Sequence, residues 1–258
     1  MKTFSGSLII ILSILLFSGC KGKGSMKKDL QTGNDTITVP DTGYTGIKKY
    51  MSGKYIVKEV TFKNGVKEGL MKSFYQDGRV RQTFWYKNDL KEDSSKFYYQ
   101  EGQLFRTTPY KRDTIDGIQI QYYRTGKLKA KIGYSKGLRT PYLEEFTQEG
   151  KMIGNYPGLV VNIKDEYRAK GVYRISLELS DMAMSENVKY YRGDLSKGVF
   201  DTAHCKVIKT IKGVGYLDLR KTGSRNTGSV GVIASVLTNF GNRHLIYKKI
   251  ELPYNDLN

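Results

Sequence analysis

The chain has 258 residues, of which 39% are hydrophobic and 26% are charged, as expected for a folded globular protein of one or two domains. Its formal net charge is +18, and the basic residues are spread along the whole sequence. No recognition-helix or zinc-finger pattern accompanies them, so we expect no nucleic-acid partner. This charge indicates either a solvated cationic surface or attraction to anionic lipid head groups or acidic polymers.

The N-terminus predicts export. A basic start precedes an apolar run over residues 8–17, which is too short to span a bilayer and suits the core of a signal peptide. The following Phe17-Ser18-Gly19-Cys20 resembles the lipobox of bacterial lipoproteins. That resemblance implies a signal peptide over residues 1–20, with Cys20 acylated as the first residue of the mature protein. The alternative is an ordinary secretory signal with an incidental cysteine.

The residues after the signal predict a flexible tether. Residues 21–46 are rich in Lys, Gly, Ser, Thr and Asp, a composition that does not form a core. Lys21 stands where aspartate retains enteric lipoproteins in the inner membrane, so that resemblance implies delivery to the outer membrane. We therefore expect a location in the cell envelope, anchored to a membrane by lipid, and not in the cytoplasm. Cys205 is then the one remaining cysteine and is expected to be a buried, inert thiol.

A repeat of 24 residues dominates the region from 47 to 156. Its turn glycines are Gly78, Gly102, Gly126 and Gly150. Aromatic pairs precede the first three of them, at Phe74-Tyr75, Tyr98-Tyr99 and Tyr122-Tyr123. Two further columns are expected to be turns: Gly65, Asp89, Asp113 and Gly137; and Gly69, Asp93, Gly117 and Pro141. Each unit is predicted to form two strands, for example over 70–75 and 80–86, and successive hairpins are predicted to form one antiparallel sheet.

The segments Phe74–Val80 and Tyr122–Leu128 resemble the MORN repeat, in the variant found in YwqK-type "antitoxin" families. The resemblance covers about residues 50–153 and implies an antiparallel β-hairpin sheet. It also implies roles in membrane association, protein scaffolding or lipid contact. Asp89 and Asp113 stand where glycine is usual, and Pro109 and Pro141 lie beside strands; these departures together predict a less regular third and fourth unit.

The aromatic residues of the repeat have two interpretations. They either pack the sheet or present a platform for sugar rings. The candidate binding-face residues are Phe74, Tyr75, Trp85, Tyr98, Tyr99, Tyr122 and Tyr123.

The period disappears after Pro157, and residues 157–258 predict a second all-β domain. Seven strand-like runs are expected over 159–163, 172–179, 188–191, 205–211, 215–219, 229–237 and 246–252. Seven short strands in about 100 residues are typical of an immunoglobulin-like or fibronectin-like β-sandwich. The Arg192-Gly193-Asp194 tripeptide is interpreted as a simple turn.

Catalytic and metal-binding patterns are missing from the sequence. His204 and Cys205 are adjacent and are expected to point to opposite faces of a strand, as are Glu144 and Glu145. We therefore expect no enzyme activity, no metal and no cofactor.

The sequence thus predicts a non-catalytic cell-envelope lipoprotein that acts as a binding or scaffolding module, with an envelope protein or a glycan as partner. Two alternatives remain open. The first is a carbohydrate- or peptidoglycan-binding module that uses exposed aromatic rings. The second is a hydrolase with an unrecognised carboxylate site.

Overall fold

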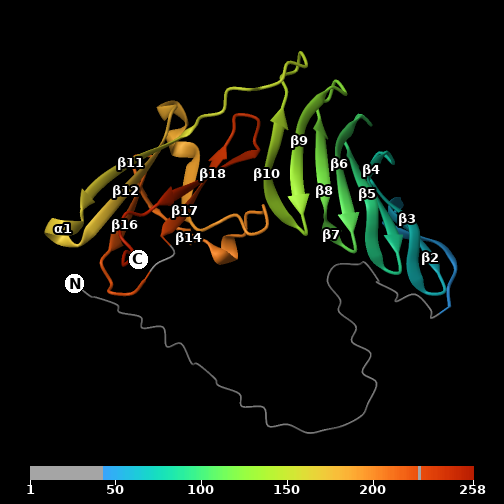
Figure 1. Cartoon of the computed structure of the whole chain (residues 1–258). Coiled ribbons are helices and arrows are strands. Elements are labelled where there is room, and N and C mark those ends of the chain that lie inside the picture. The colour runs from blue at the N-terminus through green and yellow to red at the C-terminus, as the bar shows by residue number, and fades with distance from the viewer. Residues whose placement is uncertain (1–42, 226–227) are drawn as a thin grey trace, which may run out of the picture. The chain divides into compact units, whose positions relative to one another are not determined.

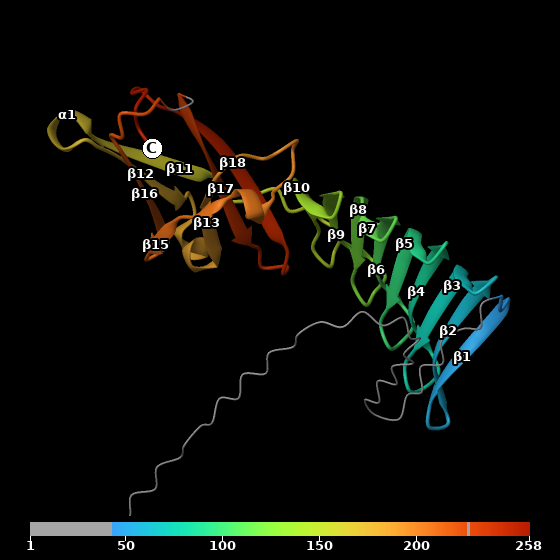
Figure 2. The same ribbon diagram turned by 90° about the horizontal axis from the view of Figure 1, so that it is seen from below.

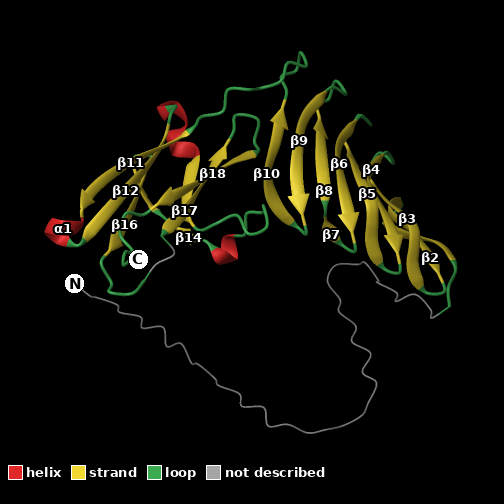
Figure 3. Ribbon diagram, viewed as in Figure 1, coloured by secondary structure: helices red, strands yellow, loops and turns green. Residues whose placement is uncertain are grey.

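The computed structural model describes residues 43–225 and 228–258, and these are almost entirely β-structure (Figures 1 and 3). They belong to one compact unit, Thr38–Asn258. The predicted signal peptide, Cys20 and most of the predicted tether lie outside the described residues. Tyr44 and Thr45, at the end of that tether, already contact the turn at Asn64–Gly65: the amide of Gly65 donates to the carbonyl of Tyr44, and the amide of Asn64 donates to the hydroxyl of Thr45.

The repeat region forms one ten-stranded antiparallel sheet in which neighbours in sequence are neighbours in space. Figure 2 shows the strands side by side in a single row. The strands are β1 (Gly46–Ser52), β2 (Tyr55–Lys63), β3 (Val66–Phe74), β4 (Val80–Lys87), β5 (Leu90–Tyr98), β6 (Leu104–Lys111), β7 (Thr114–Ile115), β8 (Gly117–Tyr122), β9 (Leu128–Ser135) and β10 (Leu138–Glu145). The predicted repeat sheet is therefore confirmed.

The glycine column at 78, 102, 126 and 150 forms the longer turns, as predicted. In each turn the amide of the glycine donates to the carbonyl three residues earlier, for example Gly78 N to Tyr75 O at 3.0 Å. The glycines have φ between 82° and 99°, a region that costs a residue with a Cβ about 1–2 kcal/mol. The repeat thus places glycine where the backbone requires it.

The second turn column forms two-residue hairpins, and aspartate replaces glycine there without loss of regularity. Asn88 and Asp89 both have positive φ, 50° and 65°, as the type I′ turn requires. Asp89 accepts a hydrogen bond from the amide of Lys67 at 2.9 Å, and Asp113 accepts one from the amide of Lys91 at 3.0 Å. These side-chain contacts offset part of the strain that glycine avoids, so the expected irregularity does not arise at these turns.

The third column was predicted as turns, and that prediction was wrong. Gly69, Asp93 and Gly117 lie at register shifts where one strand carries two extra residues against its neighbour. A shift of the same kind separates Arg139 from Leu143, on either side of Pro141. Bulges of this kind bend a strand and increase its twist. Because they recur every 24 residues, the bend recurs at the same level of every hairpin.

The sheet has two chemically different faces. We call one the packed face; its cross-strand partners run in a row through Lys58, Ser73, Gln82, Phe97, Arg106, Gln121, Ala130 and Glu145. Buried rings accompany this row, including Phe62, Phe84 and Tyr86. Phe84 makes edge contacts with Phe97 and Tyr110 at centroid distances of 5.8 and 6.0 Å. The packed face is therefore a hydrophobic layer built by lateral contacts along the repeat.

Residues 159–258 form two four-stranded sheets around one hydrophobic core. The first sheet has the order β11-β12-β16-β15 and the second β14-β13-β17-β18. The strands are β11 (Leu159–Glu166), β12 (Val172–Leu179), β13 (Val188–Arg192), β14 (Lys206–Val207), β15 (Lys209–Ile211), β16 (Val214–Arg220), β17 (Ser229–Leu237) and β18 (Arg243–Glu251), with the short helices α1 (Tyr167–Lys170), η1 (Met182–Asn187) and η2 (Thr202–His204). Inward residues such as Ile175, Leu177 and Val232 are fully buried.

Two details of this region differ from the sequence prediction. The single strand expected over 205–211 is two short strands in different sheets, because the chain crosses from one sheet to the other at Ile208. His204 ends the helix η2 and is not in a strand, so its side chain and that of Cys205 are not on opposite faces of a strand. The Arg192-Gly193-Asp194 segment begins at the last residue of β13 and is held by hydrogen bonds from Arg192 to Asn258 and from Tyr247 to Asp194.

Candidate binding face of the repeat sheet

The second face of the repeat sheet, which we call the open face, carries exposed apolar side chains in a line across the strands. Leu70 and Trp85 are direct cross-strand partners, as are Ile118 and Gly133, so each pair projects from the same face. Leu70, Trp85, Ile118 and Tyr142 are all exposed, and the Trp85 side chain retains 48% of its accessible surface. Leu70, Ile118 and Tyr142 are 24 residues or a multiple of 24 apart, and each sits in a bulge. The bulges thus display an apolar row.

A polar row runs beside the apolar row on the open face. Its cross-strand partners are Lys49, Glu59, Lys72, Thr83, Lys96, Thr107, Ile120, Lys131 and Glu144. At its ends the lysines are paired, Lys49 with Glu59 at 3.7 Å and Lys131 with Glu144 at 3.0 Å. The hydrogen bond to Glu144 raises the pKa of Lys131, and the same bond lowers the pKa of Glu144.

The centre of the open face is cationic. Lys72 and Lys96 flank Thr83 in the polar row, and neither has an ion-pair partner among the described residues. Their backbones lie two strand spacings apart, about 9–10 Å. Trp85 is two residues beyond Thr83 on β4 and therefore projects from the same face. The exposed Trp85 ring therefore shares the open face with Lys72 and Lys96, two lysines that have no ion-pair partner over residues 43–225 and 228–258.

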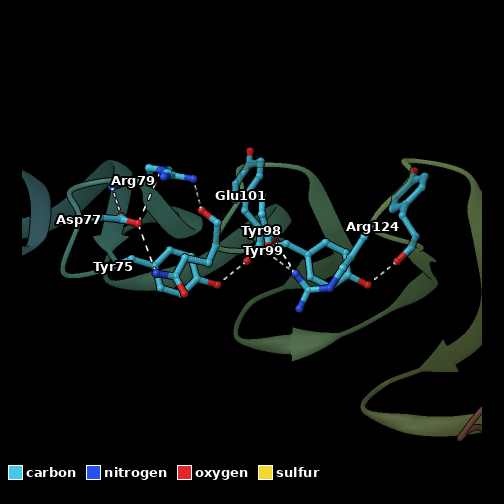
Figure 4. Close-up of polar contacts among 9 residues, drawn as sticks. Tyr75, Asp77, Arg79, Tyr98, Tyr99, Glu101 and Arg124 are labelled. Carbon is cyan, nitrogen blue, oxygen red and sulfur yellow. Dashed lines mark hydrogen bonds and ion pairs between the residues drawn. The ribbon is translucent and has the colours of Figure 1, made fainter.

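The three tyrosines that open the longer turns do not stand free. Each hydroxyl donates to a main-chain carbonyl of the next repeat: Tyr75 to Tyr98 at 2.6 Å, Tyr99 to Tyr122 at 2.9 Å and Tyr123 to Phe146 at 2.6 Å. Figure 4 shows the first two of these contacts side by side. Burial raises the pKa of Tyr99 and of Tyr123. We call these three residues the tyrosine ladder.

Charged side chains extend the ladder on the turn surface. The guanidinium of Arg124 lies over the ring of Tyr99, 4.7 Å from its centroid, and also pairs with Glu101 (Figure 4). Arg79 donates to the carbonyl of Gln100 at 2.9 Å. Phe74, Tyr98 and Tyr122, the neighbours of the ladder tyrosines, are half-buried at the strand ends. Of the seven predicted binding-face aromatics, Trp85 alone is fully in the exposed class.

The last strand of the repeat ends at a buried carboxylate, Glu145, whose side chain has 0% exposure. Three neutral groups donate to it: Thr238 at 2.8 Å, Asn242 at 2.7 Å and Tyr156 at 3.0 Å. Asn242 also accepts from Gln121 of β8 at 3.1 Å. These hydrogen bonds join the packed face to the β17–β18 hairpin. Burial and the nearby Glu145 carboxylate raise the pKa of Tyr156.

His244 lies in this same joint, stacked on Tyr156 at a centroid distance of 4.4 Å. Burial lowers its pKa, against a smaller opposing effect of Glu145. Glu144 and Glu145 project from opposite faces, as the alternation predicts, so they do not form a carboxylate pair. The described ranges contain no group of three His, Cys, Asp or Glu residues arranged to hold a metal ion.

The two remaining titratable candidates are His204 and Cys205. His204 contacts the carboxylate of Asp201 at 2.8 Å. Cys205 is half-buried, and burial raises the pKa of its thiol, which disfavours the reactive thiolate. In the part of the chain that the structure describes, no helix is long and apolar enough to cross a membrane.

Sequence reasoning missed most of the open face. Leu70, Ile118, Tyr142, Lys72 and Lys96 were not singled out, although Lys72 and Lys96 are 24 residues apart. The missing step was to assign each repeat column to one side of the sheet. The bulges at Gly69 and Asp93 each add two residues to one strand, which preserves the alternation of sides but shifts which residues of neighbouring strands lie opposite each other.

Comparison with known proteins supports the repeat. A family model described as "MORN repeat variant" matches residues 94–112 and 115–136, which cover β6, β8 and β9 completely and β5 in part. No significant match was found among curated proteins or solved structures. The chain therefore contains MORN-like repeats within an all-β fold.

Proposed function

We propose that this protein is a non-catalytic cell-envelope lipoprotein whose open face binds an envelope partner. One observation carries the proposal: the side chains of Leu70, Trp85, Ile118 and Tyr142 are exposed on the open face, opposite the packed face that contacts the β17–β18 hairpin. Exposed apolar side chains that gather on one face of a folded protein are typical of an interaction surface.

The anchor is the second part of the proposal. The lipobox-like Phe17–Cys20 and the apolar run before it support acylation of Cys20 and export. Lys21 supports delivery to the outer membrane. Several acyl chains give durable attachment, because each buried CH₂ contributes about 0.8 kcal/mol. Residues after Cys20 then act as a tether between the bilayer and the sheet.

We infer further that residues 157–258 are an immunoglobulin-like domain that contributes protein contacts. With its strands lettered in chain order, β11, β12, β16 and β15 correspond to A, B, E and D, and β13, β17 and β18 correspond to C, F and G. The ABED and CFG sheets are the arrangement of immunoglobulin constant-type domains. This topology supports the assignment of a fold, and the fold alone carries no activity.

Site-specific photo-crosslinking in intact cells tests the binding face. A photoreactive phenylalanine analogue at Ile118 is expected to form a discrete adduct with an envelope component. The same analogue at Gln148, an exposed residue in the turn before Gly150 and outside the strands of the open face, is the matched control and is expected to give none. Absence of an adduct at Ile118, Trp85 and Leu70 alike would overturn the proposal.

A second candidate function is binding of an acidic glycan. Trp85, Lys72 and Lys96 favour it, because an indole ring stacks on the apolar face of a sugar while the two ammonium groups complement carboxylates. The tyrosine ladder gives it no support, since its hydroxyls are already used within the sheet.

Isothermal titration with a uronic-acid oligosaccharide and a neutral oligosaccharide of equal length tests this candidate. We expect saturable binding of the acidic ligand that is weakened at least about tenfold by Trp85→Ala. Tyr216→Ala removes an exposed ring from β16 and is expected to leave binding unchanged. Flat titrations with both ligands would remove the candidate and leave the protein-binding proposal standing.

The hydrolase alternative gains no support from the described residues. Glu145 is buried and held by three neutral donors, whereas Glu144 is paired with Lys131 on the other face. General acid–base catalysis by two carboxylates needs both to face one substrate.

A further inference from the structure

A second exposed surface lies far along the chain from the open face, where residues 206–212 cross between the two C-terminal sheets. Lys206–Val207 form β14 at the edge of one sheet, and Lys209–Ile211 form β15 at the edge of the other (Figures 1 and 2). Between them Ile208 is only 4% exposed and belongs to the hydrophobic core. We call residues 206–212 the crossing segment.

The crossing segment combines exposed aliphatic side chains with lysines. Val207 is 72% exposed and Ile211 is 51% exposed. Lys206, Lys209 and Lys212 of the same segment are also exposed. No acidic residue occurs from 202 to 217, so the crossing segment itself carries only positive charge. Exposed aliphatic residues interleaved with lysines along the sequence are a composition that favours binding at the interface of an anionic bilayer.

The segment is held in place by the core beneath it. The amide of Ile208 donates to the carbonyl of Tyr190 at 2.9 Å, and the Tyr190 hydroxyl donates to the carbonyl of Gly213 at 3.2 Å. Val207 is paired with Tyr191, and Lys209 with Tyr216. Val207 and Ile211 are therefore displayed on a fixed backbone, so their exposure is a property of the fold.

We propose that the crossing segment docks onto an anionic phospholipid surface. The three ammonium groups complement lipid phosphates, and Val207, the most exposed aliphatic side chain of the segment, enters the region between head groups and acyl chains. Addition of a peptide strand is disfavoured, because β14 and β15 have two and three residues and expose too little backbone to pair with another chain. Docking here needs neither the open face nor an acyl group on Cys20, so it goes beyond the function proposed above.

An environment-sensitive fluorophore on residue 207 tests the contact. The probe is attached to Val207→Cys in the full chain carrying Cys20→Ser and Cys205→Ser, so that one thiol reacts. The matched control is Ile163→Cys in the same background, because Ile163 is 50% exposed and lies on β11, at the opposite edge of the sheet that contains β15. Both proteins are mixed with vesicles of phosphatidylcholine alone or with phosphatidylglycerol added.

We expect a blue shift and a several-fold rise in emission at position 207 with phosphatidylglycerol vesicles, and a quencher carried by the lipid should suppress it. Position 163 should not respond. The triple variant Lys206→Ser, Lys209→Ser and Lys212→Ser should abolish the response at 207. An equal response at both positions, a response to phosphatidylcholine alone, or the same shift with soluble dextran sulfate would overturn the proposal, as would no response at 207. Background binding through the N-terminal residues is common to both labelled proteins and cannot produce the expected difference.

Discussion

The hydroxyl of Tyr99 donates a hydrogen bond of 2.9 Å to the main-chain carbonyl of Tyr122, 23 residues further along the chain. The same contact joins Tyr75 to Tyr98 and Tyr123 to Phe146. Each hairpin is therefore fixed to the next at its turn as well as along its strands. A single hairpin is marginal in water, so contacts between units contribute to the stability of the whole sheet.

Replacement of Tyr99 by phenylalanine tests the ladder. The ring and its contact with Arg124 remain, whereas the carbonyl of Tyr122 loses its donor. We expect the free energy of unfolding to fall by about 0.5–1.5 kcal/mol, the usual net contribution of one hydrogen bond. Urea denaturation followed by circular dichroism measures this. Tyr98→Phe is the control, because no described residue hydrogen-bonds to its hydroxyl; an equal loss in both variants would contradict the assignment.

The sequence predicts the ladder's position but not its role. The period of 24 residues places Tyr75, Tyr99 and Tyr123 in one column, and the glycine after each predicts the turn. Whether a tyrosine in such a column binds a ligand or its own backbone depends on the distance to the next unit. That distance is set by the sheet, which the period alone does not describe.

The bulges limit prediction more severely. Asp93 was predicted to lie in a turn because the equivalent residues of two other repeats, Gly69 and Gly117, are glycines. The residue has the positive φ of a turn, 59°, but it lies inside β5. Left-handed residues occur in both features, so composition cannot separate them. The hydrogen bonds to Glu145 were equally unpredictable from the sequence, because their donors Thr238 and Asn242 are more than 90 residues away in the chain.

The turn at Asp113 gives a second prediction. Asp113 has φ of 64°, and its carboxylate accepts from the amide of Lys91. Both Asp113→Ala and Asp113→Gly remove the carboxylate that accepts from Lys91. Alanine retains the strain of a Cβ at positive φ, whereas glycine adopts this φ without strain. We expect the alanine variant to be less stable than the glycine variant by about 1 kcal/mol. Thermal unfolding of the two proteins makes the comparison, and equal stabilities would show that the backbone at this turn carries no strain.

Burial of His244 predicts a pH dependence of stability. Its pKa in the folded protein lies below the ordinary value of 6.5, so the unfolded chain binds the proton more readily. The stabilisation is present above the unfolded pKa and is lost as pH falls through the folded pKa. We expect the free energy of unfolding to decrease below about pH 6.5, with a limiting slope of about 1.4 kcal/mol per pH unit.

The variant His244→Phe separates this effect from other titrations. Phenylalanine retains a ring to stack on Tyr156 and carries no ionisable group. The decrease in stability between pH 6.5 and pH 5 should therefore be smaller in this variant than in the wild type, when both are measured by urea denaturation across that range. Parallel pH profiles would show that His244 does not carry the dependence.

Gly133 gives the last prediction. It pairs with Ile118 in the β8–β9 ladder, and a Cβ built at this position would overlap the Thr140 hydroxyl and stand 2.9 Å from the Cβ of Tyr142. Thr140 and Tyr142 belong to the bulge of the last hairpin, so a side chain at 133 must displace it. We expect Gly133→Ala to lower the free energy of unfolding by about 1–3 kcal/mol, the usual cost of overpacking. Gly154→Ala is the control, since a Cβ there meets no atom within 4 Å. If Gly133→Ala instead proved as stable as its control, the bulge at Thr140–Tyr142 would have to yield freely, and the apolar row would lose the fixed position of Tyr142 on which its role as a binding face depends.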